Sequence, residues 1–225
     1  MDSKREPNHS QPETEGHTIP WASFYDFSVK LVSFGKDREL REEIIKIAGI
    51  RPGERVLDVG CGTGELVLAA KSSTGSTGVV QGIDASINMI EYARQKAEQK
   101  GADVEFRVGL IENISFPDNY FDIVLSSLMM HHLPEDLKKK GLAEIFRVLA
   151  LGGRLLVVDI ESTPGGSLVQ RLSELIIQVH GGHQRMQGAV KKLAPFADEA
   201  GFVKVETGKI NRQFSFMKGE KPEAA

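Results

Sequence analysis

Between residues 55 and 160, short apolar runs alternate with longer segments in which apolar residues recur at helical spacing. The apolar runs predict five strands, at 55–59, 79–83, 104–108, 121–126 and 154–160. The segments of helical spacing predict helices at 65–72, 86–100 and 134–149. Strands that alternate with helices in this way favour a parallel sheet with right-handed crossovers and helices on both faces.

The C-terminal part of the chain departs from this alternation. A helical pattern at 189–200 is followed by two strand patterns, at 202–206 and 214–217, which a short polar link joins. These two strands predict a hairpin at one edge of the sheet. The Gly-rich segment 161–188 precedes them, and we expect it to form a helical lid over the carboxyl ends of the strands.

Length, composition and charge narrow the class of protein. The chain has 225 residues, 40% hydrophobic and 26% charged, as expected for one globular domain. Residues 1–19 are polar and predict a disordered tail, which leaves a single domain at 20–225. A net charge of -3 argues against a nucleic-acid partner. With one cysteine, and with no apolar run of signal-peptide or membrane-spanning type, we expect a cytoplasmic protein with no stable membrane insertion. The oligomeric state is not predicted.

The loop Gly60-Cys61-Gly62-Thr63-Gly64 follows the first predicted strand directly. In an open α/β sheet, ligands bind outside the carboxyl ends of the strands, and glycine lets the backbone approach them closely. The loop lacks the lysine of a Walker motif, and its third glycine comes one residue earlier than in a dinucleotide fingerprint. Asp58 lies two residues before the loop and suits a ligand that carries an amino group rather than a pyrophosphate.

Asp84 ends the second predicted strand, 20 residues after Gly64. A carboxylate at this place typically binds the two hydroxyls of a ribose. Two alternatives need no ligand: a tight strand-to-helix turn at the glycines, and a helix N-cap at Asp84, a role that Ser86 can also fill. An adenosyl group that bears an amino acid satisfies the requirements of Asp58, the glycines and Asp84 together.

Four motifs in this order resemble class I S-adenosylmethionine-dependent methyltransferases: VLDVGCGTGE, GIDAS, ISFPDNYFDIVLSS and EIFRVLALGGRLLVVDI. The resemblance covers roughly residues 20–160 and is strongest to the ubiquinone/menaquinone biosynthesis C-methyltransferases and their small-molecule relatives. It implies an α/β, Rossmann-like fold, a doubly wound seven-stranded, mostly parallel sheet with an antiparallel C-terminal hairpin strand. It also implies methyl transfer from S-adenosylmethionine to a small-molecule or lipid-like acceptor. The alternative is a catalytically silent protein that binds the cofactor in a regulatory or assembly role.

The resemblance implies cofactor contacts at the positions that match the family. These are Tyr25, Asp58, Gly60, Cys61, Gly62, Gly64, Asp84, Ala85, Met89, Leu110, Ile111 and Ser127. Cys61 is interpreted as a small residue that fits, and Tyr25 and Met89 also have the spacing of core residues. Leu110 departs from the family, which often has Asp or Asn there to accept a hydrogen bond from the adenine. Leu151 stands where the family usually has proline.

Methyl transfer is an in-line displacement, in which orientation alone contributes roughly 7–11 kcal/mol in favourable cases. A general base is needed only when the nucleophile arrives protonated. His131 follows the fourth predicted strand and is the candidate catalytic residue, with Asp159, at the end of the fifth, as a further candidate. A loop histidine that only orients its neighbours is the alternative.

Four further residues are candidates for substrate binding: Met130, His132, His180 and His183. The run Met129-Met130-His131-His132 differs from the quinone C-methyltransferases and favours the broader small-molecule group. His180 and His183 lie three residues apart across two glycines, which is not a recognised frame of metal ligands, so no metal is predicted.

Overall fold

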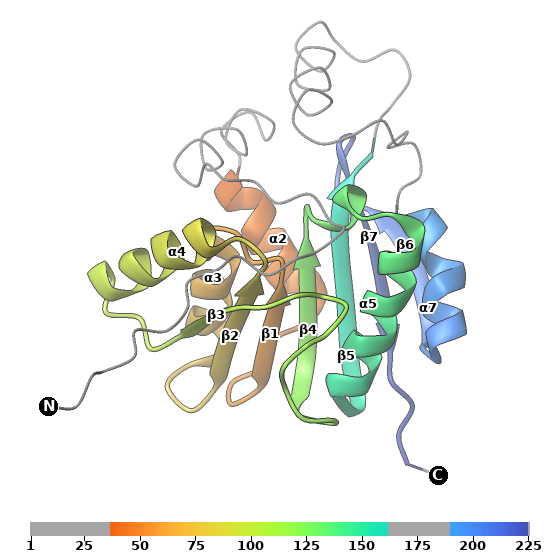
Figure 1. The fold of residues 1–225 in the computed structure, drawn as a ribbon, viewed down its shortest axis with the longest axis horizontal. Helices are drawn as coiled ribbons and strands as arrows, with labels where there is room; N and C mark the ends of the chain where they lie inside the picture. Colours follow the sequence, from red (N-terminus) through yellow and green to blue (C-terminus); the bar gives the residue numbers. More distant parts are fainter. Residues whose placement is uncertain (1–36, 162–189, 225) are drawn as a thin grey trace, which may run out of the picture.

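The computed structural model describes residues 37–161 and 190–224. Their centre is a seven-stranded sheet with the order β3-β2-β1-β4-β5-β7-β6 (Figure 1). The strands are β1 (Arg55–Val59), β2 (Val79–Asp84), β3 (Glu105–Val108), β4 (Phe121–Ser127), β5 (Leu149–Ile160), β6 (Val203–Lys209) and β7 (Phe214–Glu220). Strands β1 to β5 pair in parallel, and β7 pairs antiparallel with both β5 and β6. The predicted α/β sheet with its C-terminal hairpin is confirmed.

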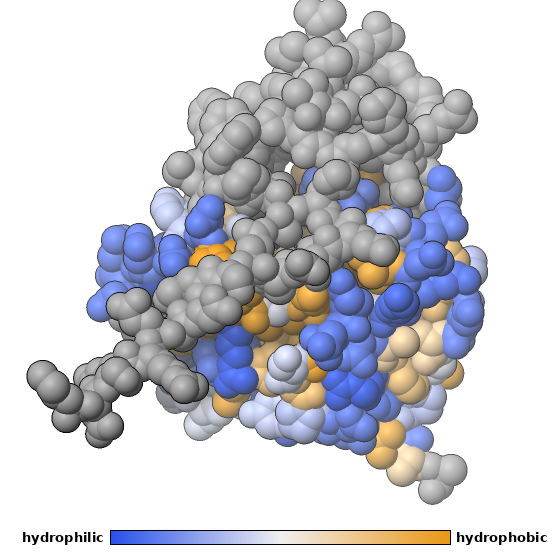
Figure 2. Space-filling model, viewed as in Figure 1, coloured by the Kyte–Doolittle hydropathy of each residue, from blue (hydrophilic) through white to orange (hydrophobic). Residues whose placement is uncertain are grey.

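Helices cover both faces of the sheet. On one face lie α2 (Asp37–Ala48), α3 (Glu65–Thr74) and α4 (Ile87–Gln99), and on the other α5 (Glu135–Val148), the short 3-10 helix η2 (Lys191–Leu193) and α7 (Ala194–Ala200). Successive strand residues serve the two faces in turn, so Val56 packs beneath α2 and α3 and Leu57 beneath α5. Burial on both faces explains why the parallel strands are continuous apolar runs in the sequence. In Figure 2, hydrophilic residues cover the outer sides of α4 and α5.

Several elements differ from their predicted bounds by one to three residues, and two differ more. β5 starts at Leu149, directly after α5, and not at Arg154. Gly152 adopts a φ of 73° where the register with β4 shifts, between the pairs Phe121–Leu149 and Ile123–Arg154. The predicted helix at 189–200 is divided into η2 and α7, with Pro195 in the first turn of α7, where a missing N–H costs nothing.

The order of the strands determines where a ligand site opens. The chain moves from β1 outward to β2 and β3, and then returns to the other side of β1 with β4. The switch point therefore lies between β1 and β4, and the crevice outside their carboxyl ends is the expected binding place. The carboxyl ends of β1, β2, β4 and β5 lie at this edge (Figure 1). Among the helices of the described residues, none is long and apolar enough to cross a membrane.

Candidate cofactor and active site

The glycine loop has a backbone that only glycine adopts easily. Gly60, Gly62 and Gly64 have φ values of 76°, 50° and 78°. Space is restricted as well: a Cβ on Gly60 would lie 2.5 Å from Met129 Cγ, and one on Gly64 would lie 2.5 Å from Phe106 Cζ. The glycines therefore let the loop turn at the end of β1 while the chain after β4 and strand β3 pack directly against it.

The N–H groups of this loop bond within the chain. Gly60 and Cys61 donate to Ile83 O at 2.8 and 2.9 Å, and Gly62 donates to Asp84 Oδ2 at 2.9 Å. Gly64 donates to Cys61 O at 2.9 Å. A phosphate cradle directs several such donors at its anion. Because these four are engaged, the loop is not a phosphate cradle, in agreement with the missing Walker lysine.

Asp58 is the acid of β1, one residue before the end of that strand, and it is only 2% exposed. Burial, with a smaller contribution from the negative charge of Asp84, raises the pKa of Asp58 to about 8. Within the described part of the chain, its Oδ1 atom has no hydrogen-bond partner. A buried carboxylate without a partner is costly. A bound ligand with an amino group would supply the missing partner.

Asp84 connects the second strand to the glycine loop. Its Oδ2 atom accepts the hydrogen bond from Gly62, and its Oδ1 atom accepts one from Ser86 N at 2.8 Å. Burial raises the pKa of Asp84, and these two N–H donors oppose that effect. Ser86 is the N-cap of α4 and accepts from Met89 N at 3.4 Å, so Asp84 does not cap that helix. Each carboxylate oxygen has a further lone pair for a ribose hydroxyl.

Cys61 lies in the loop, but its thiol points away from it. The Sγ atom packs in the core on the α3 side of the sheet, 2.8 Å from the position a Cβ would take on Gly82. Burial, together with the charges of Asp84 and Asp58, raises the pKa of the Cys61 thiol. A thiol held in its protonated form is a poor nucleophile. Only the backbone of Cys61 belongs to the candidate cofactor site.

The other predicted cofactor residues lie around this centre or outside the described residues. Ala85 follows Asp84, Met89 is buried in the first turn of α4, and Ser127 ends β4. The side chain of Ile111 packs in the core, where its Cδ1 atom lies 2.6 Å from the Cβ position of Gly141, so only its backbone is left for a ligand. Leu110 forms an isolated β-bridge with Asn113. Tyr25 lies outside the described residues.

His131 and Asp159 form a pair at the same edge of the sheet. Leu128, directly after β4, has a φ of 57°, which is costly for a leucine, and it turns the chain into the 3-10 helix η1 (Met130–His132). This turn places His131 Nδ1 2.5 Å from Asp159 Oδ1, and His131 N donates to Asp159 Oδ2 at 2.9 Å. Ile160 N donates to Asp159 Oδ1 at 2.8 Å.

The charge of Asp159 determines the tautomer of His131, and so which ring nitrogen can accept a proton. Asp159 is fully buried, and burial alone would raise its pKa, but the charge and hydrogen bond of His131 lower the pKa below its ordinary value. An ionised carboxylate only accepts hydrogen bonds, so Nδ1 carries the proton that it shares with Asp159. In the neutral imidazole, Nε2 is then the atom that accepts a proton.

Of the predicted substrate residues, two lie within the described residues and two lie outside them. Met130 is 1% exposed and packs in the core beneath η1, so it supports the loop, and its contact with a substrate stays a prediction. The ring of His132 lies beside that of His131, with 3.9 Å between centroids. His180 and His183 lie outside the described residues. Within those residues, no group of three or more His, Cys, Asp or Glu side chains is arranged to hold a metal.

Comparisons with known proteins identify the family of the chain. The pattern of the family described as "Methyltransferase domain" matches residues 50–201. A ubiquinone/menaquinone biosynthesis C-methyltransferase of Erwinia tasmaniensis is 38% identical over 140 residues, which are 61% of this chain and 55% of that protein. Its namesake in Hydrogenovibrio crunogenus is 30% identical over 204 residues, covering 82% of this chain and 80% of that protein.

Solved structures show the same fold. A SAM-dependent methyltransferase from Aquifex aeolicus superposes with a TM-score of 0.69 and 22% identity, over 88% of this chain and 96% of that one. The phosphoethanolamine N-methyltransferase 2 of Haemonchus contortus, in complex with S-adenosyl-L-methionine, has a TM-score of 0.68 and 19% identity, over 92% and 61%. Fold, site and sequence together define a cofactor-binding protein of the Rossmann-like methyltransferase type. The chain belongs to the S-adenosylmethionine-dependent methyltransferase family.

Proposed function

We propose that this protein transfers a methyl group from S-adenosylmethionine to a small-molecule or lipid-like acceptor by in-line displacement. The observation that carries the proposal is the position of the His131–Asp159 pair, which lies after β4 and at the end of β5, at the same sheet edge as Asp58 and the glycine loop after β1. The residues present fit the cofactor: Asp58, whose Oδ1 atom has no partner among the described residues, for the amino group, the close backbone of Gly60–Gly64 for the methionine part, and Asp84 for the ribose. When bound, S-adenosylmethionine supplies a methyl group activated by its sulfonium.

His131 acts on the acceptor in this proposal. Its Nε2 atom takes the proton from a hydroxyl of the acceptor, while Asp159 holds Nδ1–H and stabilises the imidazolium that forms. Loss of that proton would make the oxygen, or a carbon of the ring that bears it, nucleophilic enough to take the methyl group, and S-adenosylhomocysteine would leave. After transfer to a ring carbon, that carbon would lose its hydrogen as a proton. A hydroxylated aromatic ring fits this chemistry, and the relatives named for ubiquinone/menaquinone biosynthesis support an acceptor of that kind.

Methyl-tritiated S-adenosylmethionine, incubated with the full chain and a whole-cell metabolite extract, tests the activity. Label in the organic phase supports an apolar acceptor, and label in the aqueous phase supports a polar one. Binding of the cofactor without any transfer would contradict the enzyme and favour the catalytically silent alternative.

The variant Asp159→Asn tests the role of the pair. An amide in place of the carboxylate no longer stabilises the imidazolium, so we expect transfer to slow about 100-fold or more. The affinity for S-adenosylmethionine, measured by calorimetry, stays unchanged because Asp159 does not belong to the cofactor part of the site. Equal loss of both would indicate that Asp159 only maintains the fold.

A further inference from the structure

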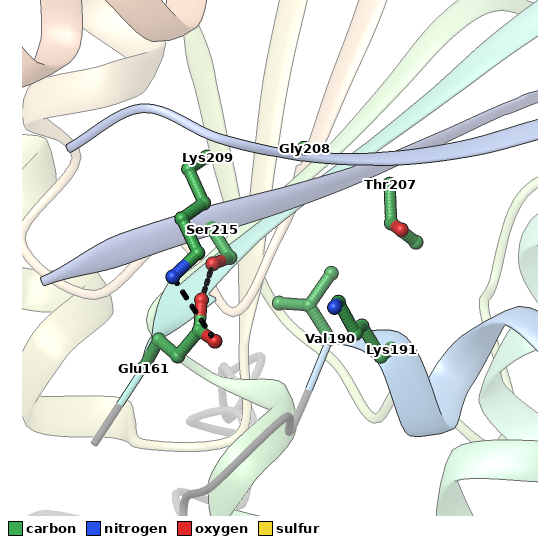
Figure 3. A pocket seen from close by; sticks show the side chains of 7 residues that line it. All are labelled: Glu161, Val190, Lys191, Thr207, Gly208, Lys209 and Ser215. Atoms are coloured by element: carbon green, nitrogen blue, oxygen red, sulfur yellow. Dashed lines mark hydrogen bonds and ion pairs between the residues drawn. The ribbon is translucent and has the colours of Figure 1, made fainter. Parts of the chain in front are cut away.

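A pocket of about 220 Å³ lies between the end of β5, the start of η2 and the hairpin β6–β7. Its lining residues are Glu161, Val190, Lys191, Thr207, Gly208, Lys209 and Ser215. In Figure 3, Lys209, Ser215 and Glu161 gather on one side, with Val190 and Lys191 across from them and Thr207 farther along β6. A cavity of about 150 Å³ is enough for a benzene ring, so this pocket has room for a ring with a polar substituent.

The register of the strands places this pocket beside His131 and Asp159. Asp159 of β5 pairs with Ser215 of β7, and Ser215 pairs with Lys209 of β6. Directly paired residues project from the same face of a sheet. Asp159, Ser215 and Lys209 therefore form one row across three neighbouring strands, and the pocket begins one strand away from the residue that holds His131.

The carboxylate of Glu161 interacts with two other residues that line the pocket. The hydroxyl of Ser215 donates to Glu161 Oε2, and Lys209 Nζ lies 3.6 Å from Glu161 Oε1. The side chain of Glu161 is 17% exposed and that of Lys209 is 56% exposed, so Lys209 remains accessible to solvent although it pairs with Glu161.

Positive charge exceeds negative charge around the pocket. Two lysines, Lys191 and Lys209, line it against one carboxylate. Lys192 follows in η2, and its charge and that of Asp159 both act on Lys138 in the first turn of α5. The whole chain has a net charge of -3, so this excess is local and does not follow from composition.

We propose that this pocket binds an acidic group of the methyl acceptor, a carboxylate or a phosphate, and so directs the reacting atom toward His131. The inference rests on the proposed function, because it assigns the pocket to the acceptor of that reaction. Lys191 and Lys209 bind the anion, and the hydroxyl of Thr207 donates a hydrogen bond to it, whereas the hydroxyl of Ser215 is already donated to Glu161. Glu161 holds Lys209 and Ser215 in place, at the cost of a negative charge near the anion.

Calorimetry with three matched phenols tests this pocket in the full chain, with and without S-adenosylhomocysteine. The probes are 4-hydroxybenzoate, 4-hydroxyphenyl phosphate and the neutral methyl ester of 4-hydroxybenzoate. We expect at least one of the two acids to bind at least tenfold more tightly than the ester. The stronger of the two identifies the acidic group. Equal affinities for acids and ester, or no binding of any probe, would overturn the proposal.

Charge variants separate binding of the anion from maintenance of the fold. The double variant Lys191→Gln, Lys209→Gln should weaken binding of the acidic probe at least tenfold and leave binding of the ester unchanged. Glu161→Gln should strengthen binding of the acidic probe. Lys204→Gln, an exposed lysine of β6 that pairs with Glu220, is the matched control and should change nothing. S-adenosylhomocysteine should bind all variants equally. If it binds none of them, the proposed function fails, whereas the probe titrations still decide the pocket.

Discussion

Asp58 and Lys221 are both buried ionisable residues, and they lie toward opposite ends of the parallel strands. Lys221, directly after β7, is 8% exposed, and its Nζ atom donates to Asn119 Oδ1 at 2.8 Å and to the carbonyls of Phe146 and Leu149 at 2.8 and 2.9 Å. These carbonyls belong to the C-terminal end of α5, which has no further helical N–H groups to bond. Lys221 thus has a complete set of protein partners.

Asp58 has no such set. Its Oδ1 atom lacks a partner in the described residues, and burial and the negative charge of Asp84 both raise its pKa. A charge that the fold itself requires is surrounded by partners from the same chain, whereas a charge kept for a ligand is not. The difference predicts that the two residues fail in different ways when they are replaced.

The largest effect is expected for Lys221→Met. The variant keeps most of the apolar stem but leaves the end of α5 without its donor, so the free energy of unfolding should fall by about 3 kcal/mol. Urea denaturation measures this loss, and calorimetry should show unchanged affinity for S-adenosylmethionine.

Lys218→Met is the matched control for Lys221→Met. Lys218 lies on the same strand and pairs with Glu206 at 2.9 Å, but its side chain is 45% exposed, so we expect a loss below about 1 kcal/mol. Equal losses in the two variants would show that the buried bonds of Lys221 do not matter.

Asp58→Asn should lose affinity for S-adenosylmethionine and keep its stability, the reverse of Lys221→Met. Loss of a hydrogen bond between charged groups, about 1.5–3 kcal/mol, corresponds to an affinity for S-adenosylmethionine that is about 10- to 100-fold weaker. The unfolding free energy without ligand should not fall, because no protein contact of the Oδ1 atom is lost.

Asp122→Asn tests whether any carboxylate of the sheet behaves like Asp58. Asp122 lies at the other end of β4 and pairs with Arg55 at 3.0 Å. This variant should lose stability and keep its affinity for the cofactor. A stability loss in Asp58→Asn with unchanged affinity would remove Asp58 from the cofactor site.

Most of the fold could be predicted from the sequence because buried parallel strands are uninterrupted apolar runs. β1 occupies its predicted bounds, and β2 and β4 extend only one residue further. The start of β5 could not be predicted, since Gly152 and Gly153 have the composition of a turn and only the pairing of Leu149 with Phe121 shows that the strand continues. Local composition does not contain that long-range pairing.

The candidate site could be predicted in part for the same reason. The spacing of Asp58, the glycines and Asp84 is a short-range signal, and the structure brings these residues together. The contact between His131 and Asp159 joins residues 28 apart and exists because β4 and β5 are neighbours. Nothing in the sequence around Lys221 indicates burial, since that depends on where α5 ends in space.

The pH dependence of binding sharpens the comparison further. The pKa of Asp58 is raised to about 8, so the ligand-free protein holds a proton that must leave before the carboxylate can pair with an ammonium group. Affinity for S-adenosylmethionine should therefore rise about tenfold or more between pH 6 and pH 8. The rise should stop near pH 8, because an α-amino group itself loses its proton at about 7.7–8.0.

The same raised pKa makes the free energy of unfolding fall as pH rises, whereas the affinity for the cofactor increases. The ordinary pKa of an aspartate is about 3.9, so the stability that the proton gives is present below that value and is lost as pH rises through about 8.

Calorimetry in buffers of different ionisation enthalpy should detect proton release on binding of S-adenosylmethionine in the wild type and none in Asp58→Asn. Proton release that persists in the variant would assign it to another group.

The smallest effect is expected for Cys61→Ala, three residues from Asp58. The thiol packs on the α3 side of the sheet against Gly82, so its removal should cost about 1 kcal/mol of stability and change cofactor affinity less than about twofold. Cys61→Ser is the informative control, since a buried hydroxyl in this apolar place should cost more stability than the shorter alanine.

Because burial raises the pKa of the Cys61 thiol, iodoacetamide should modify it slowly in the folded protein. Rapid alkylation, or a tenfold loss of affinity in Cys61→Ala, would place the thiol among the groups that the fold keeps for the ligand.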